Sequence, residues 1–169
     1  MRLAVFVVHG TKKLLTRVGN PTPDASGRST TALGDWYATV LFWKPQVTLF
    51  VNEPTLLPVL MPLAPAATLT ERFPQALSLL LAAHGVSQRF IDEEVAQMTD
   101  CRLATTTNRS VLGIMTEFTR LAEAYGAPGG EPDLIPLALR LATTPCGPLY
   151  RRHISPDREL AALIAQHTR

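Results

Sequence analysis

Four consecutive polar residues lie where an apolar, strand-like run passes into a run with helical periodicity: Thr107, Asn108, Arg109 and Ser110. Free backbone N–H groups and the positive end of the helix dipole make the start of a helix a binding site for anions. Arg109 would add a guanidinium to such a site. We therefore expect these four residues to recognise a phosphate or carboxylate, either on an anionic small molecule or on a protein partner.

The same four residues are open to a second interpretation. Thr, Asn and Ser are the types that cap helices by accepting a hydrogen bond from a backbone N–H, so Thr107 or Asn108 would only begin the helix. Arg109 would then be a solvated or ion-paired surface residue. The sequence contains no GxxxxGK[ST] and no GxGxxG motif, and the junction therefore has no specific nucleotide signature.

A catalytic alternative rests on His9, which follows a strand-like apolar run and titrates near neutral pH. His9 would act as the acid or base of a small hydrolase or nuclease, supported by Asp35 or Glu53. Arg109 would stabilise an oxyanion or a phosphate. The opposing interpretation is a hydrogen-bonded structural histidine, and the sequence leaves the distances among these residues open.

Metal and cofactor chemistry have no motif in this sequence. No histidine or cysteine is spaced from another as metal ligands are, and no serine lies in GxSxG. We expect no metal and no cofactor. Cys101 and Cys146 lack CxxC spacing and should be two separate, reduced thiols. Because no complete catalytic constellation appears, we expect a binding or regulatory module rather than an enzyme.

Aromatic residues gather in the region 36–50. They are Trp36, Tyr37, Phe42, Trp43 and Phe50. An exposed aromatic strand face can stack the bases of single-stranded nucleic acid, and this gives a third functional alternative. Side-chain alternation places at least half of these residues in the core, and the net charge is only +2, so nucleic acid is not the partner that we favour. Such a face could also support a homodimer.

The elements that would position these residues follow from apolar periodicity. We expect a buried strand at 2–8, a hairpin at 36–43 and 46–51, an edge strand interrupted by prolines at 56–63, and a strand at 101–106. Helices are expected from about residues 12, 70, 87, 108, 133 and 156. Residues 19–32 and 127–132 read as loops because Gly, Pro and small polar residues dominate them.

Length and composition point to one unit. A chain of 169 residues with 46% hydrophobic and 18% charged residues suits a single α+β domain spanning 1–169. We expect a mainly antiparallel sheet of four to five strands with helices packed largely on one face. The short apolar run near the start is not a signal peptide, and no apolar stretch is long enough for a membrane span, so we expect a cytoplasmic protein.

Three segments together resemble a known family: residues 10–15, residues 33–38 with 50–56, and residues 107–115. The family consists of small bacterial and archaeal proteins that are classed only as a domain of unknown function. The resemblance runs from the first strand to the helix that starts near Asn108, and more loosely to residues 155–157. It implies a single domain and no particular activity, cofactor or catalytic residue.

Overall fold

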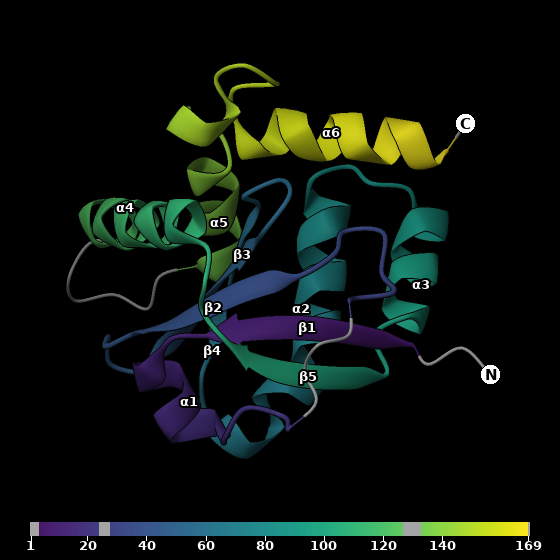
Figure 1. Ribbon diagram of the computed structural model, residues 1–169. Helices are drawn as coiled ribbons and strands as arrows, with labels where there is room; N and C mark the ends of the chain where they lie inside the picture. Colours follow the sequence, from purple (N-terminus) through teal and green to yellow (C-terminus); the bar gives the residue numbers. More distant parts are fainter. Residues whose placement is uncertain (1–3, 24–27, 127–132, 169) are drawn as a thin grey trace.

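The computed structural model describes residues 4–23, 28–126 and 133–168 (Figure 1). The strands are β1 (Val5–Gly10), β2 (Trp36–Leu41), β3 (Val47–Asn52), β4 (Pro58–Pro62) and β5 (Asp100–Thr105). The α-helices are α1 (Lys12–Val18), α2 (Leu69–Ala83), α3 (Gln88–Ala96), α4 (Arg109–Tyr125), α5 (Leu134–Leu141) and α6 (Pro156–His167). Short 3-10 helices form at η1 (Ala66–Thr68) and η2 (Gly147–Leu149).

The strands form one sheet in the order β4-β3-β2-β1-β5. β1 pairs in parallel with both β2 and β5, whereas β3 is antiparallel to β2 and β4. The predicted α+β class and the strand number are confirmed, and the sheet is mixed. Parallel pairing needs a long connection rather than a tight turn. The chain passes through α1 and a loop between β1 and β2, and through the rest of the sheet, α2 and α3 before it reaches β5.

The predicted hairpin is confirmed. Trp36 lies opposite Asn52, and Leu41 lies opposite Val47, with a cis Lys44–Pro45 peptide in the connection. β4 occupies an edge of the sheet, as its prolines predicted, since a residue without an N–H is tolerated there. β1 extends through His9 and Gly10, two residues beyond the predicted strand, because both residues pair with β5.

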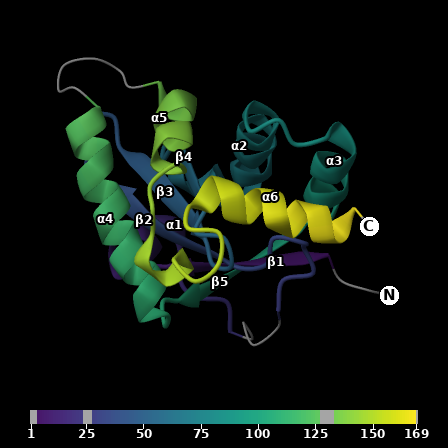
Figure 2. The same cartoon turned by 90° about the horizontal axis from the view of Figure 1, so that it is seen from above.

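Aromatic packing shows what covers each face of the sheet. Trp36 and Phe50 pack against Phe73 of α2, with ring centroids 5.1 and 4.0 Å apart. Tyr37, the next residue along β2, points to the opposite face, where its hydroxyl meets the start of α4. Figure 2 shows α4 and α2 well apart on the molecule. The sequence predicts helices largely on one face of the sheet, and the structure adds α4 on the opposite face.

Burial corrects one functional expectation. Trp36, Tyr37 and Phe50 are each fully buried. The hypothesis that the strand aromatics form a stacking face for nucleic acid is therefore wrong for these three residues, because the helices on both faces of the sheet bury them.

The predicted loop at residues 19–32 contains no helix or strand at 19–23 and 28–32, and residues 24–27 lie outside the described part of the chain. It runs beside two strands. Thr22 bonds both the N–H and the carbonyl oxygen of Leu103 in β5, and Thr30 does the same for Val5 in β1. The loop thus satisfies backbone groups that no neighbouring strand reaches. The predicted loop at 127–132 lies outside the described residues.

No helix within the described residues is long and apolar enough to cross a membrane. Cys101 and Cys146 are free thiols, as predicted. Burial raises the pKa of Cys101 to about 12 and that of Cys146 to about 11, so both remain protonated near neutral pH.

Candidate functional site

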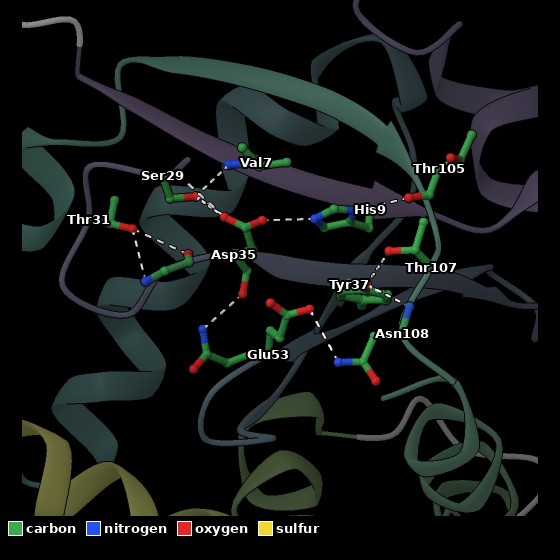
Figure 3. A network of polar contacts seen from close by, with 12 residues as sticks. Val7, His9, Ser29, Thr31, Asp35, Tyr37, Glu53, Thr105, Thr107 and Asn108 are labelled. Carbon is green, nitrogen blue, oxygen red and sulfur yellow. Dashed lines mark hydrogen bonds and ion pairs between the residues drawn. The ribbon is translucent and has the colours of Figure 1, made fainter. Parts of the chain in front are cut away.

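Polar side chains meet where β1 and β5 end and α4 begins (Figure 3). His9 is the second-last residue of β1, Thr105 is the last residue of β5, and Asn108 is the N-cap of α4. Because β1 and β5 run in parallel, their carboxyl ends open toward the same edge of the sheet. Tyr37 belongs to β2, and Asp35 immediately precedes that strand, whose start lies against the last residues of β1.

Both ring nitrogens of His9 face hydrogen-bond acceptors. Nε2 lies 2.8 Å from Oδ2 of Asp35, and Nδ1 lies 2.9 Å from the carbonyl oxygen of Thr105. A carbonyl oxygen only accepts, so Nδ1 must carry a hydrogen. The proton between Nε2 and Oδ2 is therefore the one that decides the charge of the pair.

The environment favours the charged form of the pair. Burial alone would lower the pKa of His9, but the hydrogen bonds to Asp35 and Thr105 and the charges of Asp35 and Glu53 outweigh it, so this pKa is raised. Burial alone would raise the pKa of Asp35, but His9 and Ser29 outweigh it, and this pKa is lowered. His9 and Asp35 thus form an imidazolium–carboxylate pair whose side chains are only 16% and 23% exposed.

Asp35 is held on its other side by the loop that precedes β2. Its Oδ1 accepts a hydrogen bond from the Ser29 hydroxyl at 2.7 Å, and Ser29 Oγ in turn accepts from the backbone N–H of Val7. The same loop is anchored to α3 by buried Glu94, whose two oxygens accept from the N–H groups of Ala32 and Leu33. These bonds fix the carboxylate that faces His9.

Tyr37 connects the histidine to the start of α4. Its ring stacks on the His9 ring with centroids 4.6 Å apart. Its hydroxyl accepts a hydrogen bond from the backbone N–H of Asn108 at 3.0 Å and lies 3.4 Å from Thr107 Oγ1. A buried aromatic residue therefore sets the position at which the helix begins.

Asn108 caps α4, as the second interpretation of the junction predicted. Its Oδ1 accepts from the N–H groups of Ser110 and Val111. Its Nδ2 lies 3.5 Å from Oε2 of Glu53, the residue that follows β3. Two of the helix N–H groups that an anion would use are thus already bonded, and a carboxylate lies nearby.

Three side chains at the junction are exposed to solvent: those of Thr107, Arg109 and Ser110. Within the described residues, the guanidinium of Arg109 and the hydroxyl of Ser110 have no hydrogen-bond or ion-pair partner. The guanidinium of Arg109 and the hydroxyl of Ser110 are donors facing water, whereas the Thr107 hydroxyl contacts that of Tyr37. The capped helix start thus still presents side-chain donors, although fewer backbone ones.

The structure therefore brings most of the predicted site residues together. His9, Asp35, Glu53, Thr107 and Asn108 belong to one cluster, and Arg109 and Ser110 extend it along α4 without a side-chain bond to it. The arrangement limits acid–base chemistry, because His9 has no ring nitrogen free for a substrate. No group of three or more His, Cys, Asp or Glu residues is placed to hold a metal in the described chain.

Sequence reasoning missed several residues that build the cluster. Tyr37 was assigned only to an aromatic strand, although its place opposite His9 in parallel register makes it the link to Asn108. Ser29 lay in a loop without periodicity. Buried Asn52 directly follows the predicted strand at 46–51, and its amide donates hydrogen bonds to the carbonyl oxygens of Leu33 and Asp35. Its position directly before Glu53 was the signal available.

Comparison with curated proteins and with solved structures gives no match. Comparison with protein families gives one, to a domain of unknown function, DUF6933, over residues 7–159. The matched range takes in the whole polar cluster and every strand except the first residues of β1. The predicted membership of a family classed as a domain of unknown function is thereby confirmed, and the protein belongs to the DUF6933 family.

Proposed function

We propose that this protein is a binding module that recognises an anionic group, on a small molecule or on a protein partner, through Thr107, Arg109 and Ser110. The observation that supports this most is the contrast in hydrogen bonding at the junction. His9, Asp35, Tyr37 and Asn108 use their polar atoms on one another or on the backbone, whereas the neighbouring guanidinium and the Ser110 hydroxyl face solvent without a described partner.

The charges at the junction also suit an anion. Arg109 is the first residue of α4, where the positive end of the helix dipole adds to the guanidinium charge. His9 and Asp35 nearly cancel each other as an ion pair. The carboxylate of Glu53 lies beside the Asn108 side-chain amide and would repel an anion there. An anion would therefore approach at Arg109. The His9–Tyr37 stack holds the junction in place before a ligand arrives, which reduces the entropy lost on binding.

Titration with inorganic phosphate tests this proposal. Hydrogen bonds to a charged group contribute about 1.5–3 kcal/mol, so Arg109→Ala should weaken phosphate binding at least about tenfold. Arg120→Ala is the matched control, because Arg120 is an exposed arginine on the same helix that pairs with Glu117. Arg109→Lys should retain part of the affinity. Equal affinities for the wild type and for Arg109→Ala would contradict the proposal.

A second candidate is a small hydrolase or nuclease, favoured by the meeting of His9, Asp35 and Glu53 in one cluster at the carboxyl ends of β1 and β5. Since both His9 nitrogens are occupied, the acid or base would be Glu53. Hydrolysis of p-nitrophenyl acetate or bis(p-nitrophenyl) phosphate that disappears in Glu53→Gln would support this candidate. Rates equal to those of buffer alone, at several pH values, would count against it.

A further inference from the structure

A second surface stands apart from the polar cluster in its chemistry. We call it the basic tip and define it by five exposed residues: Lys12, Lys13 and Arg17 of α1, and Phe42 and Lys44 of the β2–β3 connection. It contains every lysine of the chain. The three lysines are therefore concentrated in the basic tip, which the small net charge of the whole chain does not reveal.

Contacts join the two parts of the basic tip. The Nζ atom of Lys13 lies 5.4 Å from the centre of the Phe42 ring, and the guanidinium of Arg17 donates a hydrogen bond to Oε1 of Gln46. Figure 1 shows α1 beside the end of β2 from which this connection leaves. Residues more than 20 positions apart in the sequence, such as Lys13 and Phe42, thus form one continuous surface.

The positive charge of the basic tip is not neutralised within the described chain. Residues 4–23 and 36–52, which include α1, β2 and β3, contain no Asp or Glu. None of the four cations forms an ion pair with a described residue. Clustered cations that form no ion pair produce a local positive potential that attracts polyanions.

Phe42 adds an aromatic surface to these cations. The residue is 62% exposed, and the other exposed large apolar residues of the described chain, Leu79, Tyr150 and Ile154, belong to other parts of the fold. The neighbouring Trp43 is partly buried against the core, which fixes the base of the connection. Proteins that bind single-stranded nucleic acid combine exposed aromatic rings, on which bases stack, with cations that contact the phosphates.

We propose that the basic tip binds single-stranded nucleic acid, with one base stacked on Phe42 and the backbone phosphates contacted by Lys12, Lys13, Arg17 and Lys44. This differs from the strand-face hypothesis, whose aromatics are buried, because it uses the hairpin connection and α1. A membrane surface fits less well. Interfacial binding depends on several apolar side chains entering the lipid, and the basic tip offers a single exposed one. The proposal is independent of the anion site at Arg109.

Fluorescence anisotropy with labelled dT20 and U20 tests the proposal through its salt dependence. Four phosphate contacts predict a slope of log K against log salt of about −2.8, or a roughly fiftyfold loss of affinity between 50 and 200 mM salt. Replacing both Lys13 and Lys44 with alanine should reduce the slope to about −1.4, or a roughly sevenfold loss. Arg89→Ala with Arg120→Ala, two exposed arginines on other helices, is the matched control and should leave the slope unchanged.

The aromatic contact is tested separately. Phe42→Ala should weaken binding at least about fivefold at constant salt, and Phe42→Trp should restore it, because stacking depends on an aromatic face. Leu79→Ala removes another exposed apolar side chain, from α2, and should have no effect. Circular dichroism of each variant checks that the fold is retained.

Three results would overturn the proposal. The first is the absence of binding to either oligonucleotide at 50 mM salt. The second is binding that the basic-tip substitutions and the control substitutions weaken equally. The third is binding to phosphatidylserine-containing vesicles or to polyglutamate that is as tight as oligonucleotide binding and insensitive to Phe42→Ala, which would assign the basic tip to polyanions in general.

Discussion

At the residue scale, the central feature is the proton shared by His9 and Asp35. The neutral alternative would move it onto Oδ2 of Asp35, where it would still be enclosed between the two side chains. The ion pair prevails because Ser29 donates to the far oxygen of the carboxylate and Thr105 accepts from the far nitrogen of the ring. Each outer bond stabilises the charge on its partner. His9 of β1 therefore bonds to Thr105 of β5 and to Asp35, which immediately precedes β2, and it is not free to act as a base.

This pair predicts a pH-dependent stability. The raised pKa of His9 gives stabilisation that is complete below the unfolded value of 6.5 and is lost as pH rises through the folded pKa. The lowered pKa of Asp35 gives stabilisation that is present above 3.8 and is lost as pH falls through the folded pKa. Asp35→Asn should therefore reduce the free energy of unfolding by about 1–3 kcal/mol at pH 5.5 and by less at pH 9.

Urea unfolding at both pH values measures the effect, and NMR titration of His9 should show a lower pKa in Asp35→Asn. Asp92→Asn is the control, since Asp92 is an exposed carboxylate on α3 bonded only to Gln88 among the described residues. A loss that is equal at pH 5.5 and pH 9 would show that the charge of His9 does not contribute.

Tyr37 gives a second residue-scale prediction. Tyr37→Phe keeps the ring that stacks on His9 but removes the acceptor of the Asn108 N–H, so it should cost about 1 kcal/mol of stability. The amide of Asn108 should also exchange with deuterium faster. Tyr150→Phe, at an exposed tyrosine, should change neither quantity. Unchanged exchange at Asn108 would mean that the hydroxyl does not hold the helix start.

At the element scale, the start of α4 combines a cap with a tertiary anchor. Asn108→Ala removes the acceptor for the N–H groups of Ser110 and Val111 and should destabilise the protein by about 1 kcal/mol. Asn108→Ser, which keeps a capping oxygen, should recover most of the loss. Thermal unfolding measures both variants. A Ser variant as unstable as the Ala variant would show that the bond to Glu53, rather than the cap, matters.

The sequence predicted the elements better than their pairing. Periodicity gave the hairpin, the edge strand with its prolines and the helix that starts after Asn108, because these depend on residues close in the chain. The parallel pairs of β1 join residues far apart in the chain, such as Val8 with Trp36 and Val8 with Leu103, so no local pattern marks them. For the same reason, the sequence identifies His9 and Asp35 as candidates but does not determine the distance between them.

At the scale of the whole molecule, one large apolar core contains or contacts residues from all five strands. The two sheet edges are modified in different ways: Thr22 bonds to β5, and prolines begin and end β4. Both features reduce strand-to-strand association. The homodimer expected from the aromatic hairpin stays a prediction, and sedimentation velocity measures it directly.

The two proposed binding surfaces should bind different ligands at different places on the molecule. Inorganic phosphate should act at the start of α4, where Arg109 and Ser110 present unbonded donors. An oligonucleotide should act at α1 and the β2–β3 connection. The sequence identified the first surface by its residue types, but not the second, because the contact between Lys13 and Phe42 joins separate segments.

The most direct test of the anion site is a series of ¹H–¹⁵N NMR spectra recorded while inorganic phosphate is added. We predict saturable shifts centred on the amides of Arg109 and Ser110, which Arg109→Ala abolishes and Arg120→Ala preserves. Shifts confined to Lys12, Lys13 and Lys44, or shifts at Ser110 that persist unchanged in Arg109→Ala, would contradict the proposed function.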